Sequence, residues 1–350
     1  MIIVIFCGGS GTRLWPLSTH HNPKQLINIV DDMSSLQAAY KRARLITDKV
    51  YLLPESRLVQ SIKNQLPELT DDQIINEPGL RGTANCLLAA IDKIARQDEI
   101  NEPVAFIHAD HFIRDTKGFK RSLEVAAEVS TKTNRLTLIG IEPTYAATGF
   151  GYIKKDQAIN GVTNAYDVAE FKEKPDYHTA SAFFASGEYL WNCGYFVASV
   201  STFVSVMSKS APELFGSYER LKQVPEVGSD EYTDTYLSLE SDAIDYALIE
   251  KVDDLVVVPA NFDWADIGSF NDAHSVSQLD VNANYVKGDV YAVDLENSYV
   301  RNDTETPLAV IGLDNVVVVN TVNGLLVARK DLSHKVGDIA KKIQANETQQ

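Results

Sequence analysis

The sequence predicts an α/β protein with a Rossmann-like, mixed and mostly parallel sheet, followed by a small β-rich module. Short apolar runs over residues 1–6 and 104–108 read as buried strands, and segments with apolar residues at helical spacing follow them. This alternation gives a sheet covered by helices on both faces. From about residue 281, short valine-rich runs alternate with turns, which indicates an all-β module. We therefore expect one domain over residues 1–278 and a module with a terminal helix over residues 279–350.

Local signals place the elements of the first domain. Ser34 is a suitable cap for a helix to about residue 46, and Thr83 has the side chain of a cap for an Ala- and Leu-rich helix that ends near residue 97. Pro175 ends a strand, because proline donates no backbone hydrogen bond. The other expected strands cover residues 50–53, 72–76, 136–141, 148–153, 168–171 and 256–258, and residues 189–198 form an apolar, aromatic run. The other expected helices cover residues 55–66, 119–130, 201–207 and 242–250, and a last one starts from residues 263–268.

The C-terminal module reads differently. Its expected strands cover residues 288–293, 299–301, 308–311, 316–320 and 325–329, and a charged amphipathic helix over residues 332–343 closes the chain.

Composition and charge exclude several classes of protein. The formal net charge of −16 argues against a nucleic-acid or anionic-membrane surface, since both require a broad basic face. Cys7, Cys86 and Cys193 lie far apart without C-x-x-C spacing, which disfavours a disulfide framework and fits a reducing cytoplasm. The N-terminal apolar run follows no basic segment and reads as a core strand rather than a signal peptide. No stretch approaches the length of a membrane span.

A glycine-rich loop follows the first strand, and it is the main functional signal. It consists of Gly8, Gly9, Ser10, Gly11, Thr12 and Arg13. Open α/β sheets bind phosphates at the carboxyl ends of strands, where glycine amides form an anion-binding concavity. Arg13 and Lys24 add cations that suit phosphate oxygens. The spacing fits neither a dinucleotide fingerprint nor a Walker loop, and a purely structural glycine turn is the alternative.

The pattern G-G-x-G-T-R-L-x-P-L over residues 8–17, with P-K-Q over residues 23–25, resembles the signature loop of the sugar-phosphate nucleotidyltransferases. Trp15 after Arg-Leu is most similar to the mannose-1-phosphate guanylyltransferase branch. Matches continue in family order to Gly268, and residues 312–330 resemble the C-terminal module of that branch. The resemblance implies a fold of the nucleotide-diphospho-sugar transferase type, with residues 1–278 as the catalytic domain.

Two aspartates are the candidates for a metal site. Asp110 follows an apolar strand within Ala-Asp-His, and Asp266 stands within Trp-x-Asp-x-Gly. Isolated, each aspartate reads as a helix cap or a turn residue. The family resemblance implies instead that both hold one Mg²⁺, an ion that takes its remaining ligands from water and substrate phosphates. His108 and His111 flank Asp110, and a zinc site there is a less favoured alternative.

The same resemblance assigns the substrate-binding residues. Glu77, with Pro78 and Thr83, would contact the nucleotide, and Glu77 would accept hydrogen bonds from guanine. An ordinary loop carboxylate is the alternative interpretation of Glu77. The sugar-phosphate site would use Gly151, Glu173, Lys174 and Asn192, with Glu173 and Asn192 on sugar hydroxyls and Lys174 on the phosphate. His108 and Lys172 depart from the family pattern.

The implied reaction is transfer of GMP from GTP to mannose 1-phosphate, with release of pyrophosphate and without a covalent enzyme intermediate. Arg13, Lys24, Asp110 and Asp266 would be the catalytic residues. The alternatives are another sugar 1-phosphate such as a manno-heptose, another base, or a regulatory subunit that binds a nucleotide sugar without turnover. GTP and mannose 1-phosphate are the expected partners, with no nucleic acid and no membrane, and a homodimer is left open.

Overall fold

The computed structural model describes residues 1–9, 11–260 and 262–347. The chain divides into two compact units, each assembled from separate stretches. The first unit contains Met1–Cys7, Tyr40–His108 and Ile113–Trp264, and the second contains Gly8–Ala39, Ala109–Phe112 and Ala265–Gln350. The expected division of the chain after residue 278 into a catalytic domain and a module stays a prediction.

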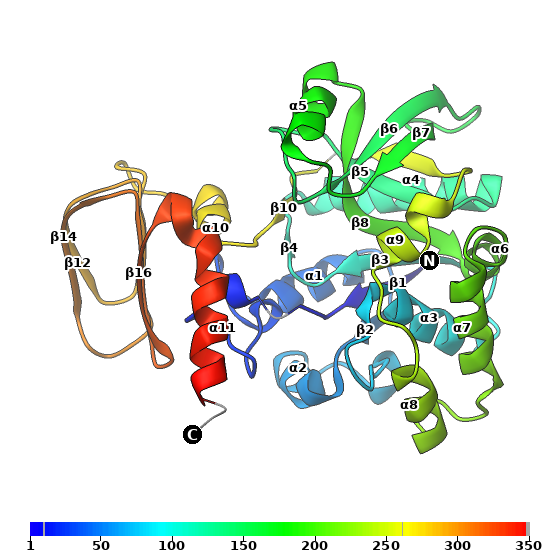
Figure 1. The fold of residues 1–350 in the computed structure, drawn as a ribbon, viewed down its shortest axis with the longest axis horizontal. Coiled ribbons are helices and arrows are strands. Elements are labelled where there is room, and N and C mark those ends of the chain that lie inside the picture. The colour runs from blue at the N-terminus through cyan, green and yellow to red at the C-terminus, as the bar shows by residue number, and fades with distance from the viewer. Residues whose placement is uncertain (10, 261, 348–350) are drawn as a thin grey trace. The chain divides into compact units, whose positions relative to one another are not determined.

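An eight-stranded mixed sheet forms the centre of the first unit, within the described residues (Figure 1). Its strand order is β2-β1-β3-β8-β5-β9-β7-β6. The pairs β1–β2, β1–β3 and β5–β9 are parallel, whereas β8 runs antiparallel to both β3 and β5. The strands are β1 (Ile2–Phe6), β2 (Val50–Leu53), β3 (Pro103–His108), β5 (Thr137–Ile141), β6 (Gly151–Ala158), β7 (Tyr166–Lys172), β8 (Tyr189–Ser199) and β9 (Val256–Pro259).

The parallel half of this sheet positions the two signature segments. All five residues of β1 are buried, as expected of a continuous β-branched run. Phe6 is in register with Leu53 of β2 and with His108 of β3. The strands β1 and β3 therefore end at the same edge, and the glycine loop and Asp110 are the segments that follow these ends.

The helices of the first unit are α2 (Val59–Gln65), α3 (Gly82–Ala95), α4 (Thr116–Thr133), α5 (Tyr177–Ser186), α6 (Val200–Ser210), α7 (Pro212–Gln223), α8 (Asp230–Leu237) and α9 (Ile244–Ala247), with 3₁₀ turns η3 (Ser56–Leu58), η4 (Asp71–Gln73) and η5 (Ile249–Lys251). Helices α3, α6, α7, α8 and α9 share one large apolar cluster with strands of the sheet, and this cluster includes Leu87 and Ile91 of α3 and Phe203 of α6. Helix α1 (Ser35–Arg44) has residues in both units. The Ser34 hydroxyl accepts a hydrogen bond from the Gln37 N–H at 3.2 Å, which confirms the expected cap.

Two local expectations for this unit are wrong, and three helices were missed. Residues 72–76 do not form a strand: Thr70 and Gln73 make a capping box that opens η4, and isolated bridges at Ile74 and Glu77 are what remains. Thr83 lies inside α3 rather than capping it, because the N-cap is Arg81. Helices α5, α7 and α8 were not expected at all.

The second unit begins with the segment around the glycine loop. It contains the 3₁₀ turns η1 (Thr12–Leu14) and η2 (Lys24–Leu26), the short antiparallel pair β4 (His111–Phe112) and β10 (Ala265–Asp266), and α10 (Phe270–Val276). Leu14, Leu17, Ile27 and Ile29 share an apolar cluster with residues of α10 and of the C-terminal strands.

The first five C-terminal strands coil as a parallel β-helix, in which successive strands alternate between two sheets, and the last strand returns antiparallel to the fifth (Figure 1). One sheet has the order β11-β13-β15-β16 and the other pairs β12 with β14. The strands are β11 (Tyr285–Lys287), β12 (Val290–Glu296), β13 (Tyr299–Asn302), β14 (Leu308–Asp314), β15 (Val316–Thr321) and β16 (Gly324–Arg329), followed by η6 (Lys330–Lys335) and α11 (Val336–Glu347). The expected β-rich module with a terminal helix is therefore present, with β11 in addition.

A search of the described residues finds no helix that is both long and apolar enough to cross a bilayer. All three cysteines are buried, and none of them forms a disulfide bond within the described residues.

Candidate active site

The glycine loop of the second unit combines open space with one tight contact. Gly11 has a φ of 60°, and a Cβ added there would lie 2.7 Å from Cβ of Lys24, so the left-handed backbone and the close approach both require glycine. Gly9 also has a positive φ, of 108°. At Gly8 the described chain places no atom within 4 Å of an added Cβ, and the residue is exposed. Nothing within the described chain requires a glycine at Gly8, which favours close approach of a ligand. Ser10 lies outside the described residues.

Lys24, Asp110 and Asp266 converge in the second unit. The ammonium nitrogen of Lys24 lies 2.6 Å from Oδ2 of Asp110 and 3.0 Å from Oδ1 of Asp266. Burial alone would lower the pKa of Lys24, but the two carboxylates raise it above its usual range. Lys24 is therefore a permanent cation between two aspartates that lie far apart in the sequence. The sequence indicates that Lys24 binds substrate phosphates, and no sequence signal indicates its pairing with the two aspartates.

The pairing of β4 with β10 explains why the two aspartates meet. Asp266 of β10 is in register with His111 of β4, the residue next to Asp110. After β10, Ser269 caps α10, and its hydroxyl accepts from the Asp272 N–H at 3.3 Å. The Asp272 carboxylate in turn accepts from the Ser269 hydroxyl at 2.8 Å and from the Gly268 N–H at 3.2 Å. Burial raises the pKa of Asp272, and the charge of Asp266 adds to this rise.

The donor set around Lys24 fits a cation that prefers oxygen ligands. The two carboxylate oxygens already surround one positive charge, and Mg²⁺ is held in proteins by one or two carboxylates together with phosphates and waters. A ligand atom of His111 lies within 4.8 Å of a carboxylate oxygen of Asp110, so the zinc alternative also stays open.

Arg13 lies at the other end of the signature loop. Its side chain is exposed, and its guanidinium borders Gly268: a Cβ added there would lie 3.0 Å from Nη2 of Arg13. A Cβ added at Gly337 of α11 would lie 3.0 Å from Cγ of Arg13. Two glycines of the second unit therefore leave space that the Arg13 side chain occupies.

Glu77 in the first unit is buried and already has partners. Its Oε1 accepts hydrogen bonds from the Tyr236 hydroxyl at 3.0 Å and from the Arg81 N–H at 3.1 Å. Burial raises the pKa of Glu77, against the lowering effect of these bonds. This environment is compatible with a structural carboxylate, and its contact with guanine stays a prediction. The Thr83 hydroxyl accepts from the Ile244 N–H at 2.9 Å.

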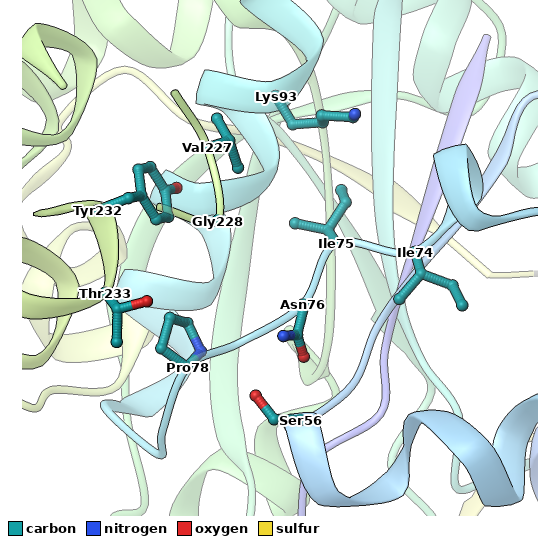
Figure 2. Close-up of a pocket in the computed structure, with 10 residues that line it drawn as sticks. All are labelled: Ser56, Ile74, Ile75, Asn76, Pro78, Lys93, Val227, Gly228, Tyr232 and Thr233. Atoms are coloured by element: carbon teal, nitrogen blue, oxygen red, sulfur yellow. The ribbon is translucent and has the colours of Figure 1, made fainter. Parts of the chain in front are cut away.

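A pocket of about 290 Å³ borders the segment that contains Glu77 (Figure 2). Asn76 and Pro78 line it on either side of Glu77, whose own side chain is not among the lining residues. Lys93 of α3 and Tyr232 of α8 contribute the opposite walls. The segment expected to bind the nucleotide therefore adjoins a pocket in the first unit that is lined by both polar and apolar residues.

The four expected sugar-phosphate residues do come together in the first unit. Gly151 of β6 is in register with Asn192 of β8, and a Cβ added at Gly151 would collide with Oε2 of Glu173. Oε1 of Glu173 accepts from the ammonium of Lys174 at 2.6 Å, whereas the buried Oε2 has no hydrogen-bond partner among the described residues. An orphaned carboxylate oxygen beside a glycine is a suitable acceptor for a ligand hydroxyl. The Lys174 side chain is half exposed, and its backbone has a φ of 42°.

Asp245 of α9 completes this cluster and was missed by the sequence analysis. Its Oδ1 accepts from Nδ2 of Asn192 at 2.7 Å, and the side-chain Oδ1 of Asn192 accepts from the Gly194 N–H at 3.0 Å. Burial raises the pKa of Asp245 to about 6, and the charge of Glu173 contributes to the rise. No sequence motif marks Asp245, because its place beside Asn192 depends on how α9 packs.

His108 and Lys172, the two departures from the family pattern, lie in different surroundings. The ring of His108 lies 5.3 Å from that of Phe6, and a Cβ added at Gly194 would lie 2.8 Å from its Nε2. Lys172 is exposed at the end of β7.

Comparisons with known proteins agree with the motifs. Residues 2–283 match the family described as nucleotidyl transferase, and residues 288–343 match the MannoseP isomerase/GMP-like beta-helix domain. The mannose-1-phosphate guanylyltransferase RfbM of Salmonella typhimurium is 35% identical over 98% of this chain and 72% of the relative. The xanthan biosynthesis protein XanB of Xanthomonas campestris pv. campestris is 34% identical over 98% and 73%, respectively.

A solved structure agrees with these relatives. It comes from Thermus thermophilus, is described as a mannose-1-phosphate geranyltransferase, and has a TM-score of 0.87 at 25% identity. The match covers 98% of this chain and 99% of that one. The expected fold class and the family resemblance are thereby confirmed. The chain belongs to the nucleotidyl transferase family, with a C-terminal β-helix domain of the MannoseP isomerase/GMP-like type.

Proposed function

We propose that this protein transfers GMP from GTP to α-D-mannose 1-phosphate and releases pyrophosphate. The observation that carries the proposal is the convergence of Asp110 and Asp266 on the Lys24 ammonium, in the unit that contains the glycine loop. Carboxylates and a lysine beside an anion-binding loop are the groups that a triphosphate and its metal require. The names of relatives that match nearly the whole chain support the choice of guanine and mannose.

The chemistry is an in-line displacement. An oxygen of the sugar phosphate forms a bond to the α-phosphorus of GTP, and the bond from that phosphorus to the bridging oxygen of pyrophosphate breaks. The sugar phosphate is already a charged nucleophile, so catalysis consists of positioning and charge neutralisation. Bound to Asp110 and Asp266, Mg²⁺ would supply neutralisation of phosphate charge.

Residues of the chain would perform the positioning. The amides of the glycine loop and the Arg13 guanidinium would bind the triphosphate, and Lys24 would neutralise charge on the reacting phosphates. In the first unit, the orphaned Oε2 of Glu173 would accept a hydrogen bond from a sugar hydroxyl, and Lys174 would face the sugar phosphate. A cytoplasmic location, expected from the sequence, is a further part of the proposal, and assembly as a homodimer is left open.

The experiment is a matrix of nucleoside triphosphates against sugar 1-phosphates, read by release of pyrophosphate. We expect GTP with mannose 1-phosphate to give the highest kcat/KM. A maximum at a manno-heptose 1-phosphate or at another base would overturn the named substrates and keep the family chemistry. Tight binding of GDP-mannose without any pyrophosphate release would identify a regulatory subunit instead.

Metal dependence is the first prediction. Removal of divalent ions with a chelator should abolish turnover, and Mg²⁺ should restore it better than Zn²⁺, because the donors are carboxylate oxygens. Asp110→Asn and Asp266→Asn should each lower kcat at least about a hundredfold, a loss of roughly 2.7 kcal/mol in transition-state stabilisation. Asp31→Asn, at an exposed position of the same unit, is the matched control. Near-normal rates for both active-site variants would contradict a shared metal.

A further inference from the structure

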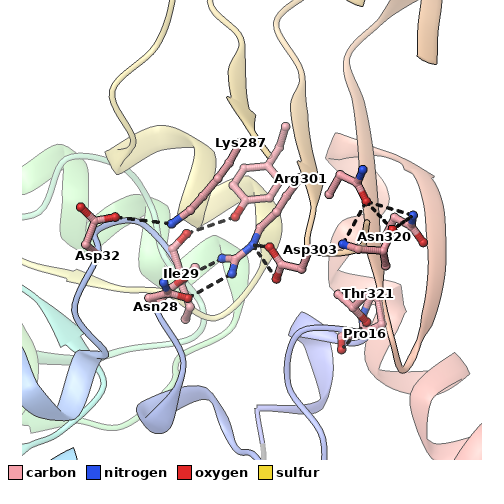
Figure 3. Close-up of polar contacts among 12 residues, drawn as sticks. Pro16, Asn28, Ile29, Asp32, Lys287, Arg301, Asp303, Asn320 and Thr321 are labelled. Carbon is pink, nitrogen blue, oxygen red and sulfur yellow. Dashed lines mark hydrogen bonds and ion pairs between the residues drawn. The ribbon is translucent and has the colours of Figure 1, made fainter. Parts of the chain in front are cut away.

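The C-terminal β-helix contacts the signature loop directly within the second unit. The carbonyl oxygen of Pro16 accepts hydrogen bonds from the Thr321 hydroxyl at 3.3 Å and from Nδ2 of Asn323 at 3.1 Å (Figure 3 shows Thr321 beside Pro16). A Cβ added at Gly324 would lie 2.6 Å from the ring of Trp15. The segment that follows Arg13 is thus fixed by residues more than 300 positions further along the chain.

Helix α11 extends this contact to Arg13 itself. Gly337, the second residue of α11, is buried, and a Cβ added there would lie 3.0 Å from Cγ of Arg13 and 3.5 Å from Oγ1 of Thr12. Separations of 3.0 Å are too short for a carbon contact without a shift. The arginine side chain is exposed and flexible, so it would move rather than the helix backbone.

The glycine at this place has no backbone explanation. Gly337 does not have a positive φ, and glycine within a helix is less favourable than alanine. The Arg13 side chain occupies the space beside this position, which explains why a glycine stands there despite its lower helix propensity.

We propose that Gly337 is a positioning residue: the absence of a Cβ there leaves room for the stem of Arg13, and this position of the stem gives the guanidinium the orientation that binds the nucleotide phosphates. The proposal rests on the proposed function, because it concerns the group that binds the triphosphate. It assigns to the β-helix domain a part in nucleotide binding, although none of its residues belongs to the expected catalytic set.

The test is Gly337→Ala in the full-length protein. We expect kcat/KM for GTP to fall roughly tenfold, since small misplacements of a catalytic group have effects of this size or larger. The KM for the sugar phosphate should stay within about twofold. The melting temperature should stay the same or rise, because alanine is the better helix former. A role in packing alone would move activity and melting temperature down together.

Gly216→Ala is the matched control. Gly216 lies in α7, is exposed, and has no described atom within 4 Å of an added Cβ. This variant should show the same change in melting temperature with unchanged kinetics.

A double-mutant cycle identifies the route of the effect. If Gly337 acts through Arg13, Gly337→Ala should change nothing further in a protein that already carries Arg13→Ala. Additive losses, wild-type kinetics of Gly337→Ala, or a lowered melting temperature would overturn the inference. Absence of guanylyl transfer by the unmodified protein would instead overturn the proposed function. In that case the same cycle, measured on the dissociation constant of GTP, still decides the role of Gly337.

Discussion

Asp245, in the sugar-phosphate cluster, makes the stability of the folded protein depend on pH. Burial raises its pKa to about 6, and the charge of Glu173 contributes to this rise, whereas the hydrogen bond from Asn192 opposes it. The folded protein therefore holds a proton on Asp245 at pH values where the unfolded chain has lost it. This contribution to stability is fully present below about pH 4 and is lost as the pH rises to about 6.

We predict that Asp245→Asn removes this dependence. Asparagine keeps an oxygen acceptor for Asn192 but carries no charge, so the variant should gain stability over the wild type between about pH 4 and pH 6. The gain should reach at most about 3 kcal/mol and then stay constant to about pH 8. Urea unfolding of both proteins across this range measures it, and Asp253→Asn, at an exposed position of the same unit, is the control. A difference that does not vary with pH would contradict the prediction.

At the scale of elements, sequence signals identify the buried strands better than their surroundings. The apolar runs of β1, β2, β3 and β9 were expected within a residue or two, because continuous burial leaves a strong pattern. The strand expected over residues 72–76 is absent, because the polar capping box of Thr70 and Gln73 competes with extended structure.

Caps also explain the missed helices. Asp176 caps α5 and Gly187 ends it in a left-handed conformation, while Ser229 caps α8. These signals were available in the sequence. The convergence of Asp110 and Asp266 was available only through a family resemblance, because the β4–β10 pair that joins them is two residues long on each side. The place of Asp245 had no signal, since it depends on tertiary packing.

Glu77 has two interpretations, an acceptor for guanine and a structural carboxylate, and a substitution can distinguish them. It joins two helices, because it accepts from the amide at the start of α3 and from the Tyr236 hydroxyl of α8. We predict that Glu77→Gln keeps the free energy of unfolding within about 1 kcal/mol, since its carbonyl oxygen can still accept both bonds. The same variant should lower kcat/KM for GTP at least about tenfold relative to ATP, because an NH₂ group replaces one acceptor.

Kinetics with each nucleotide and urea unfolding of the same preparations separate the two interpretations. Glu77→Ala is the comparison: it should be less stable by roughly 2 kcal/mol, because the buried Tyr236 hydroxyl and the Arg81 amide lose their acceptor. Equal effects of Glu77→Gln on kcat/KM for GTP and for ATP would contradict base recognition by Glu77. Glu77 would then be a structural carboxylate.

At the scale of the whole molecule, each compact unit is built from stretches that are not consecutive in the chain. The second unit takes its glycine loop, its two aspartates and its β-helix from three distant stretches. Tyr299 of β13 is fully buried and donates from its hydroxyl to the carbonyl of Ile29 at 3.1 Å. Arg301 of the same strand donates to the carbonyl oxygen of Asn28 at 2.5 Å and to its side-chain oxygen at 3.0 Å (Figure 3). The β-helix is thus part of the unit in which the signature loop folds.

Arg301 provides the test of this architecture. It is buried, and it also makes a two-oxygen contact with Asp303 at 2.8 and 3.0 Å. Burial alone would lower its pKa, but Asp303 raises it, so the guanidinium stays charged. We predict that Arg301→Met lowers the free energy of unfolding by roughly 3 kcal/mol, because Asn28 and Asp303 lose a charged partner in a buried place. Arg301→Lys should not restore it, since one ammonium cannot replace the planar fork.

Arg329 is a matched control for the same measurement by urea unfolding. It pairs with Asp331 at 2.6 Å, also two residues along its chain, but its side chain is 68% exposed. An exposed pair of this kind contributes between about 0 and 1 kcal/mol, so Arg329→Met should unfold close to the wild type. If both variants lost equal stability, the contact between Arg301 and Asn28 would add nothing beyond the local ion pair. A large loss confined to Arg301→Met would mean that the β-helix stabilises the segment carrying the signature loop.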